Sequence, residues 1–532
     1  MKNLHVFLGL AAVPGLLVLL AAGGCSGKDG NKDADTGETT DDGGGEADVA
    51  ADPDGDPGPD TDAAEDALHD EGADADADAV EDAEEETEIV ERIAAEKFIP
   101  TFTVKYCGED GAQSTEVTAK FDLLITNVSF DDLWSEGGLN SWRSLKARNP
   151  DMTITFYMLG PGEYNTSTWG DLGDGWEWIT ANHGDGAADR WTARGITYGT
   201  YLQSAAYDNE RLMIIGSDGW QHYWTETTHA EWWGGGLGFD CDGGDGIFSD
   251  NTNFQVPWEG QWYREGFPDQ PDDPEEYFEA GEYLSDLWRE DMAGFFAWAL
   301  PWLADRGVVY VPNFGYMATH AEYWDEIDDL PVPPFAAMEE AGFVCPWGVD
   351  GSYNVWNWQD KIDVMLSLEG TRALMTNHGQ PVSELEGLDR MGVPDGAGMT
   401  GWDALWFSMT SFLMGFDDAR GNAYMNFTVW GYCTYHWIDE FDPAFLHLGR
   451  ARGGYVTSGG VALREFDDGW AAVNPSLDDA SGIAVPSGQA RIVDHSNFMD
   501  PDASPLVTSF DLPARRGIVL LKDGRLIGNG DN

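Results

Sequence analysis

The sequence predicts an α/β chain: a (β/α)8 TIM barrel followed by a small C-terminal antiparallel β-sandwich and preceded by a disordered acidic tether. Strand-like and helix-like segments alternate between residues 121 and 427, which is typical of βα units and a parallel sheet. From Gly459 to Leu521 the pattern changes to strands alternating with turns. Roughly 435 residues follow the tether, a length that suits a barrel with long loops and a small appended domain.

The first 24 residues are predicted to be a lipoprotein signal peptide. Lys2 supplies a positive charge, and residues 6–21 form an apolar run that is short for a membrane-spanning helix. The run ends in small residues before Cys25, similar to a bacterial lipobox. Lipidation of Cys25 would anchor the exported chain at the bacterial outer membrane or cell surface, because several acyl chains hold a protein stably in a bilayer. An ordinary secretory signal is the alternative.

Residues 25–96 are predicted to be a solvated spacer. They carry Asp, Glu, Gly, Ala and Thr with almost no large apolar side chain, so they cannot bury enough surface to fold. The stretch from Asp29 to Glu96 holds 28 of the chain's 96 acidic residues, and their repulsion favours an extended tether. The net charge of −68 argues against nucleic acid as a partner, because phosphates need Lys and Arg. A neutral or cationic substrate fits better.

The barrel is assigned to residues 97–455 and the β-sandwich to residues 456–532. The eight barrel strands are predicted at residues 121–126, 152–157, 211–215, 246–249, 308–311, 335–338, 372–375 and 424–427. Helices are predicted from Leu139 to Arg148 and from Pro274 to Arg306. Barrel enzymes keep their chemistry at the carboxyl ends of the strands, so polar residues that follow these runs are the candidates for function.

The fourth strand leads directly into a carboxylate. It lies in Asp245-Gly-Ile-Phe-Ser-Asp250-Asn251, an apolar core that begins and ends on an acid. Asp250 is therefore the first catalytic candidate, with Asn251 beside it. The alternative is an Asx turn in which Asp250 only accepts backbone N–H bonds. Asp245 opens the strand, far from the active mouth, and is expected to fix the entering loop.

Three short motifs carry a resemblance to a known family. They are the run from Asp245 to Asn251, Val-Pro-Asn-Phe-Gly at residues 311–315, and Val-Asn-Pro-Ser at residues 473–476. In this order they resemble glycoside-hydrolase-like family fifteen, over about residues 120–522. The resemblance implies a TIM barrel related to carbohydrate-cleaving enzymes and hence an O-glycosyl hydrolase.

Glycoside hydrolysis normally needs a second carboxyl group. The sixth strand runs into the paired acids Glu339 and Glu340, and alternation along a strand lets only one of them face the interior. The family's pattern falls on Glu340, although Phe335-Ala336 replaces the Asp-Gly that often opens this strand. We expect Asp250 to act as nucleophile or base and Glu340 as general acid. A solvated acidic loop is the alternative for Glu340.

Other strand ends supply polar or aromatic groups that would line the same mouth. Tryptophan also contributes, because indole faces stack on sugar rings and many of the 24 tryptophans lie in polar or glycine-rich contexts. The predicted substrate-binding residues are Tyr157, Asp218, Asn251, Asn313, Trp347, Asn377 and His378.

Cysteine spacing gives no zinc signature. Besides Cys25 there are Cys107, Cys241, Cys345 and Cys433, an even number that allows two disulfides in an exported chain. No metal or other cofactor is expected.

The leading hypothesis is a monomeric, surface-displayed hydrolase of a neutral or amino-sugar polysaccharide. The rival is a non-catalytic carbohydrate-binding or adhesion lipoprotein on a degenerate barrel. Two carboxylates that face each other would favour the hydrolase, whereas a lone acid would favour the rival.

Overall fold

The computed structural model describes residues 99–522 with internal gaps. The gaps are residues 106–114, 127–141, 161, 165–185, 187–189, 206–209, 227–244, 253, 258, 316, 346–352, 354, 380–386, 430–435 and 443–444. The predicted signal peptide, the lipidation site Cys25 and the acidic tether to residue 96 therefore lie outside the described residues, as does Trp347.

A five-stranded parallel sheet forms the first half of the chain's core. Its strand order is β1-β2-β3-β7-β11. The strands are β1 (Phe102–Lys105), β2 (Leu123–Thr126), β3 (Thr153–Leu159), β7 (Gly246–Asp250) and β11 (Val309–Pro312). Their residues are almost all buried, as expected for parallel strands covered on both faces.

A second parallel sheet has the order β12-β13-β14. Its strands are β12 (Ala336–Glu339), β13 (Arg372–His378) and β14 (Ala423–Thr428). Isolated parallel bridges join the two sheets at both pairs of edges, from Asn313 to Met338 and from Thr101 to Met425. One apolar cluster takes side chains from all eight of these described strands: Phe102, Val104, Leu123, Ile125, Tyr157, Phe248, Val309, Val311, Ala336, Met338, Leu374 and Tyr424.

Seven of these strands lie where the sequence predicts them, and two features differ. The predicted third strand, residues 211–215, does not join the parallel sheets. Instead β6 (Glu210–Leu212) pairs antiparallel with β4 (Gly162–Tyr164) and β5 (Leu202–Ser204). The prediction failed because Leu212, Met213 and Ile215 are fully buried, and burial produces the same apolar run in either kind of sheet. The missing strand is β1, which precedes the first predicted strand.

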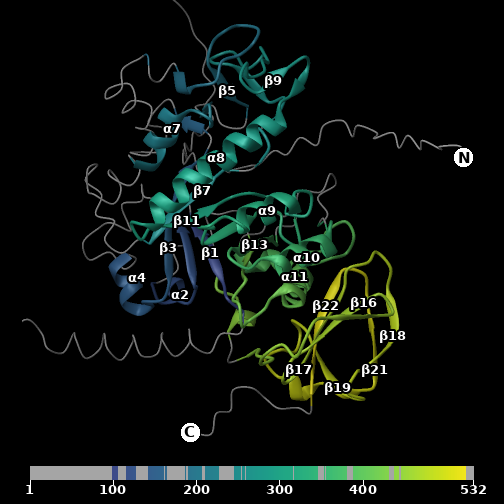
Figure 1. Ribbon diagram of the computed structural model, residues 1–532. Helices are drawn as coiled ribbons and strands as arrows, with labels where there is room; N and C mark the ends of the chain where they lie inside the picture. The colour runs from purple at the N-terminus through teal and green to yellow at the C-terminus, as the bar shows by residue number, and fades with distance from the viewer. Residues whose placement is uncertain are drawn as a thin grey trace, which may run out of the picture.

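The antiparallel sheet has the strand order β4-β6-β5-β8. Strands β4, β5 and β6 lie between β3 and β7 in the sequence, and β8 (Trp262–Arg264) follows β7. A two-stranded hairpin, β9 (Phe278–Glu279) and β10 (Glu282–Tyr283), follows β8. Figure 1 shows β5 and β9 near one end of the long helix α8 (Ser285–Ala304), away from the yellow C-terminal strands.

Helices connect the parallel strands, as the alternating pattern predicts. They are α2 (Thr115–Thr118), α4 (Trp142–Arg148), α7 (Asp218–His222), α8 (Ser285–Ala304), α9 (Ala321–Asp328), α10 (Trp358–Ser367) and α11 (Gly401–Gly415), with 3-10 turns η3 (Gly387–Gly392), η4 (Asp439–Phe441) and η5 (Pro501–Ala503). None of the described helices is both long and apolar enough to span a membrane.

Helix α11 lies between the parallel strands and the C-terminal strands, and nearly every residue in it is buried. A capping box starts the helix: the Asp403 main-chain N donates to Thr400 Oγ1 at 3.1 Å, and the Thr400 N donates to Asp403 Oδ2 at 2.9 Å. Gly517 permits the close approach of β22 (Arg516–Leu521), because a Cβ there would lie 2.0 Å from Thr410 Oγ1.

The C-terminal strands form two antiparallel sheets over one core, as predicted. The larger sheet has the order β15-β16-β17-β22-β19-β20, and β18 pairs with β21. Apolar side chains from both sheets pack together. The strands are β15 (Val456–Ser458), β16 (Val461–Glu465), β17 (Gly469–Asn474), β18 (Ala480–Ala484), β19 (Ala490–Val493), β20 (Leu506–Val507), β21 (Ser509–Leu512) and β22 (Arg516–Leu521).

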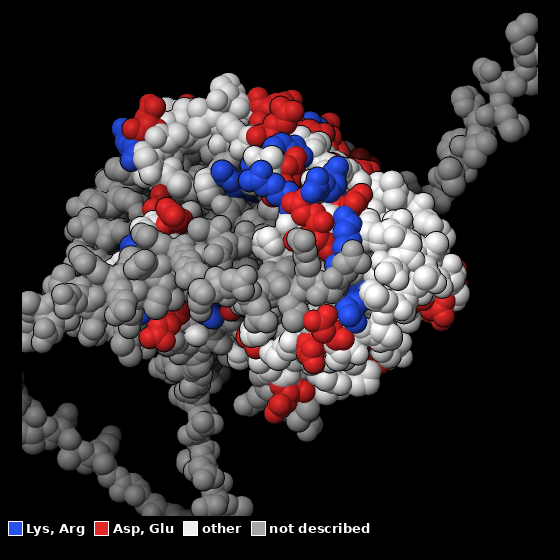
Figure 2. All heavy atoms as spheres, turned by 90° about the horizontal axis from the view of Figure 1, so that it is seen from below, with Lys and Arg blue, Asp and Glu red and all other residues white. Residues whose placement is uncertain are grey.

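Charge on the surface is interleaved rather than uniform. Figure 2 shows a face on which a group of Lys and Arg side chains lies directly beside Asp and Glu clusters. On this face the basic groups are therefore offset by acidic neighbours, and they do not form an uninterrupted basic surface of the kind that phosphates require.

Candidate active site

Strand β7 is fixed at its beginning by one acid and ends in another. Asp245, directly before the strand, accepts a hydrogen bond from the Ile154 main-chain N at 2.7 Å and forms an ion pair with Lys146 at 2.6 Å. It therefore holds the entering chain, as the sequence predicts. The buried residues of β7 then lead to Asp250 at the carboxyl end, where side chains of neighbouring parallel strands meet.

Asp250 accepts three hydrogen bonds. Tyr157 on β3 donates its hydroxyl to Oδ2 at 3.0 Å. Asn313, directly after β11, donates Nδ2 to Oδ1 at 2.9 Å, and the Asn251 main-chain N donates to the same oxygen at 2.9 Å. An Asx turn alone would not recruit side chains from both neighbouring strands. Asp250 keeps part of its surface exposed, but burial raises its pKa, and the three hydrogen bonds oppose that rise.

Asn313 links Asp250 to the second predicted acid. The same Nδ2 donates to Glu340 Oε2 at 3.1 Å, so the two N–H groups of one amide donate to two carboxyl groups. Asn313 itself is 7% exposed, whereas Glu340 remains partly exposed. Two acids and an amide from three consecutive parallel strands therefore form one hydrogen-bonded group, and both acids have a surface that a substrate can reach.

Glu339 points away from this group. It is completely buried, accepts the Ala341 N–H at 3.0 Å and the Met317 N–H, and lies 3.8 Å from Lys361 Nζ. Lys361 also donates to the main-chain oxygens of Ala341, at 2.7 Å, and Gly342. Glu339 and Lys361 thus fix the turn that carries Glu340.

His378 and Asn377, at the end of β13, have supporting roles and differ from the predicted contact with substrate. Burial lowers the pKa of His378 to about 4, so the ring is neutral at pH 7. Its Nε2–H donates to the Glu340 main-chain oxygen at 2.9 Å. Asn377 is fully buried, and its amide is used by main-chain groups: Nδ2 donates to Met375 and Asn426, and Oδ1 accepts from Phe343.

Asn251 lies beside Asp250 with a positive φ of 54°, a conformation that asparagine tolerates better than most residues. Its Nδ2 is buried without a hydrogen-bond partner among the described residues. The binding of substrate by Asn251 stays a prediction.

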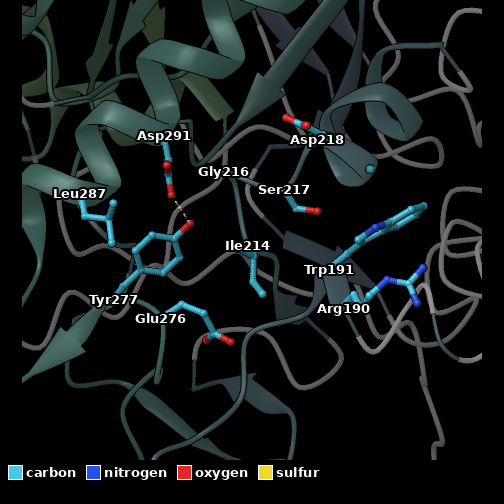
Figure 3. A pocket seen from close by; sticks show the side chains of 11 residues that line it. Arg190, Trp191, Ile214, Gly216, Ser217, Asp218, Glu276, Tyr277, Leu287 and Asp291 are labelled. Atoms are coloured by element: carbon cyan, nitrogen blue, oxygen red, sulfur yellow. Dashed lines mark hydrogen bonds between the residues drawn. The ribbon is translucent and has the colours of Figure 1, made fainter.

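Asp218 lies elsewhere, at the start of α7. It lines a separate cavity of about 770 Å³, together with Trp191, Tyr277 and Asp291. Figure 3 shows Asp218 across this cavity from the Tyr277 hydroxyl, which donates to Asp291 Oδ2 at 2.9 Å. None of the described lining residues belongs to the Asp250 group. The prediction failed because it assumed that residues 211–215 were a barrel strand ending at this mouth.

The sequence reasoning missed Glu210, the first residue of β6. It is completely buried, and burial, together with the charge of Asp250, raises its pKa. Its carboxyl group packs on Gly162 of β4, where a Cβ would lie 2.5 Å from Glu210 Oε1. The one local signal was an acid at the start of a buried apolar run.

The tryptophans test the stacking prediction only in part. Trp262 is fully buried and Trp358 is 9% exposed, so both belong to the core. Trp347, the tryptophan named among the predicted substrate-binding residues, lies outside the described residues.

Neither a protein-family profile nor a curated protein sequence matches this chain. Among solved structures, the trehalulose synthase MutB from Pseudomonas mesoacidophila MX-45 is 10% identical over 81% of this chain and 99% of that chain, with a TM-score of 0.36. A MutB mutant in complex with the substrate sucrose is 10% identical over 79% and 98%, with a TM-score of 0.42. These scores are too low to carry an argument, and the family-fifteen resemblance stays a prediction.

Proposed function

We propose that the eight parallel strands form a closed (β/α)8 barrel and that the chain is an O-glycosyl hydrolase. The parallel bridges at both junctions between the sheets support closure, as does the apolar cluster that draws on all eight described strands. Asp250, Asn313 and Glu340 then follow the fourth, fifth and sixth strands at the carboxyl-terminal mouth, where barrel enzymes carry out their chemistry.

The observation that carries the proposal is the Asn313 amide shared by two acids. Because both hydrogen bonds start at one nitrogen, Asp250 Oδ1 and Glu340 Oε2 are no farther apart than the two bonds laid end to end, about 6 Å. Retaining glycosidases place their carboxyl groups about 5–5.5 Å apart, and inverting enzymes about 6.5–9.5 Å apart. The spacing favours retention, and the facing pair favours a hydrolase over the non-catalytic binding protein.

In the first step, an Asp250 oxygen attacks the anomeric carbon while Glu340 donates its proton to the glycosidic oxygen. The bond between the anomeric carbon and that oxygen breaks, which leaves a glycosyl ester on Asp250. In the second step Glu340 takes a proton from water, the water oxygen attacks the anomeric carbon, and Asp250 leaves as a carboxylate. Tyr157 and Asn313 orient Asp250 and stabilise its charge, and His378 holds the main chain of Glu340.

The substrate class follows from charge. The strongly acidic chain would repel an acidic polysaccharide, so we propose a neutral or amino-sugar polysaccharide. Export and anchoring through Cys25 at the outer membrane or cell surface remain part of the proposal, with residues 25–96 as the spacer to a monomeric catalytic domain.

The test is a screen of the full chain against neutral and amino-sugar polysaccharides, with reducing ends as the readout. Asp250→Asn and Glu340→Gln should each abolish hydrolysis of a polysaccharide that the unaltered chain cleaves. Asp218→Asn is the matched control, because it makes the same change in the other cavity. Full activity of D250N, or equal loss in D218N, would contradict the assignment.

A further inference from the structure

Glu210 is an acid inside the molecule without the partners that buried acids usually have. It is 0% exposed, and neither carboxyl oxygen makes a hydrogen bond of normal geometry with a described residue. A buried carboxylate in this position would be costly, because nothing described replaces the hydration it loses. Ser204 on β5 lies near enough to oppose the rise in its pKa, although no regular hydrogen bond joins them.

No cation offsets the charge of Glu210 among the described residues. Its neighbour Arg211 projects to the opposite face of β6, where it forms an ion pair with Glu265 and stacks on Tyr201.

A Cβ on Gly162 would lie 2.5 Å from Glu210 Oε1 and 2.9 Å from Leu159 Cδ2. Leu159 pairs with Asp250 across β3 and β7. Asp250, which is itself an acid, therefore lies close to Glu210, and burial together with the Asp250 charge raises the pKa of Glu210. The β4-β6-β5-β8 sheet thus holds one carboxyl group near another.

The two acids have different surroundings, which decides where the negative charge lies. Asp250 accepts hydrogen bonds from Tyr157, Asn313 and the Asn251 main chain, all of which stabilise its ionised form. Burial and the charge of Asp250 together raise the pKa of Glu210 to about 8. Two nearby carboxyl groups in unequal environments ionise in separate steps.

We propose that Glu210 is a positioning residue of the hydrolase site: a neutral acid that the β4-β6-β5-β8 sheet holds beside Asp250, so that the two carboxyl groups share one negative charge. This inference rests on the proposed function and adds a third carboxyl group to it. The arrangement keeps the nucleophile ionised and leaves Glu210 protonated. When Asp250 becomes a neutral glycosyl ester, its repulsion no longer adds to the effect of burial on the pKa of Glu210, so the pKa of Glu210 falls during the reaction.

The direct test is a 13C NMR titration of the full chain labelled at the glutamate carboxyl carbon. The Glu210 signal is identified by its absence in Glu210→Gln. We expect it to titrate near pH 8 in the unaltered chain and at a lower pH in Asp250→Asn, which removes the neighbouring charge. Titration in the ordinary glutamate range, or an unchanged titration in D250N, would overturn the inference.

A kinetic test follows once a cleaved polysaccharide is known. The pH profile of kcat/KM should show an ionisation near pH 8 in the unaltered chain that disappears in E210Q, whereas a merely structural role would change activity without moving the profile. The NMR titration needs no substrate, so its failure is distinguishable from failure of the hydrolase assignment. A normal Glu210 titration with active enzyme overturns only the charge sharing, and the expected titration without cleavage overturns only the hydrolase.

Discussion

Asp250 and Glu340 accept hydrogen bonds from the same atom, Nδ2 of Asn313, at 2.9 and 3.1 Å. One amide thereby sets both the separation and the relative orientation of two acids from different strands. Bonds from a neutral donor to an ionised acceptor are among the stronger hydrogen bonds in proteins. The amide is therefore expected to matter for catalysis as well as for packing.

Removing this amide should reduce activity sharply. Asn313→Ala eliminates both bonds, and the bond to the ionised Asp250 alone is expected to contribute about 1.5–3 kcal/mol. A loss of about 3 kcal/mol corresponds to a fall of roughly a hundredfold in kcat. Kinetics on a cleaved polysaccharide, with circular dichroism to verify folding, measures the effect. A folded N313A with unchanged kcat would show that the amide does not organise the pair.

The buried pair of Lys361 and Glu339 should matter for stability. Lys361→Met leaves the Glu339 charge buried without its cation, which typically costs about 3–5 kcal/mol. The double variant Lys361→Met, Glu339→Gln removes both charges and should recover part of that loss. Urea unfolding measures the difference. If K361M is as stable as the unaltered chain, the pair of Lys361 and Glu339 does not stabilise the turn that carries Glu340.

Glu210 makes stability depend on pH in a defined direction. Its pKa is raised by burial from 4.5 to about 8, so the folded state binds the proton more tightly than the unfolded state. Its contribution to the free energy of unfolding is therefore complete below about pH 4.5 and is lost as the pH rises towards about 8. Across that window the Tm of the unaltered chain should fall relative to that of Glu210→Gln, and the difference should level off above it. If the Tm values of the two chains changed with pH in parallel, Glu210 would not be protonated in the folded state.

Gly162→Ala tests the packing beneath Glu210. The added methyl would lie 2.5 Å from Glu210 Oε1 and 2.9 Å from Leu159 Cδ2, so the carboxyl group must shift. We expect a loss of activity of about tenfold or more and destabilisation of about 1–3 kcal/mol. Gly294→Ala in helix α8 is the matched control, because a methyl there meets no atom within 4 Å. Similar behaviour of the two variants would mean that Glu210 is not held in place by Gly162.

Local sequence was sufficient for part of this site. Asp250 and Asn313 each come directly after a short, strongly apolar run, so the sequence alone indicates the end of the strand and the polar residue placed there. The choice between Glu339 and Glu340 depends on Lys361, which lies on the following helix and binds one acid of the pair. The place of Glu210 near Asp250 could not be predicted either, because it also depends on contacts between segments far apart in the sequence. The relation of the two acids depends on an antiparallel sheet whose apolar run resembles a parallel strand.

The most direct test of the retaining pair is the stereochemistry of the first product. Proton NMR of the unaltered chain acting on a polysaccharide from the screen distinguishes the anomer released by the enzyme from the one formed later by mutarotation. A first product with the anomeric configuration of the substrate is the predicted result, because Asp250 and Glu340 are close enough for two successive displacements. An initially inverted product would contradict the account.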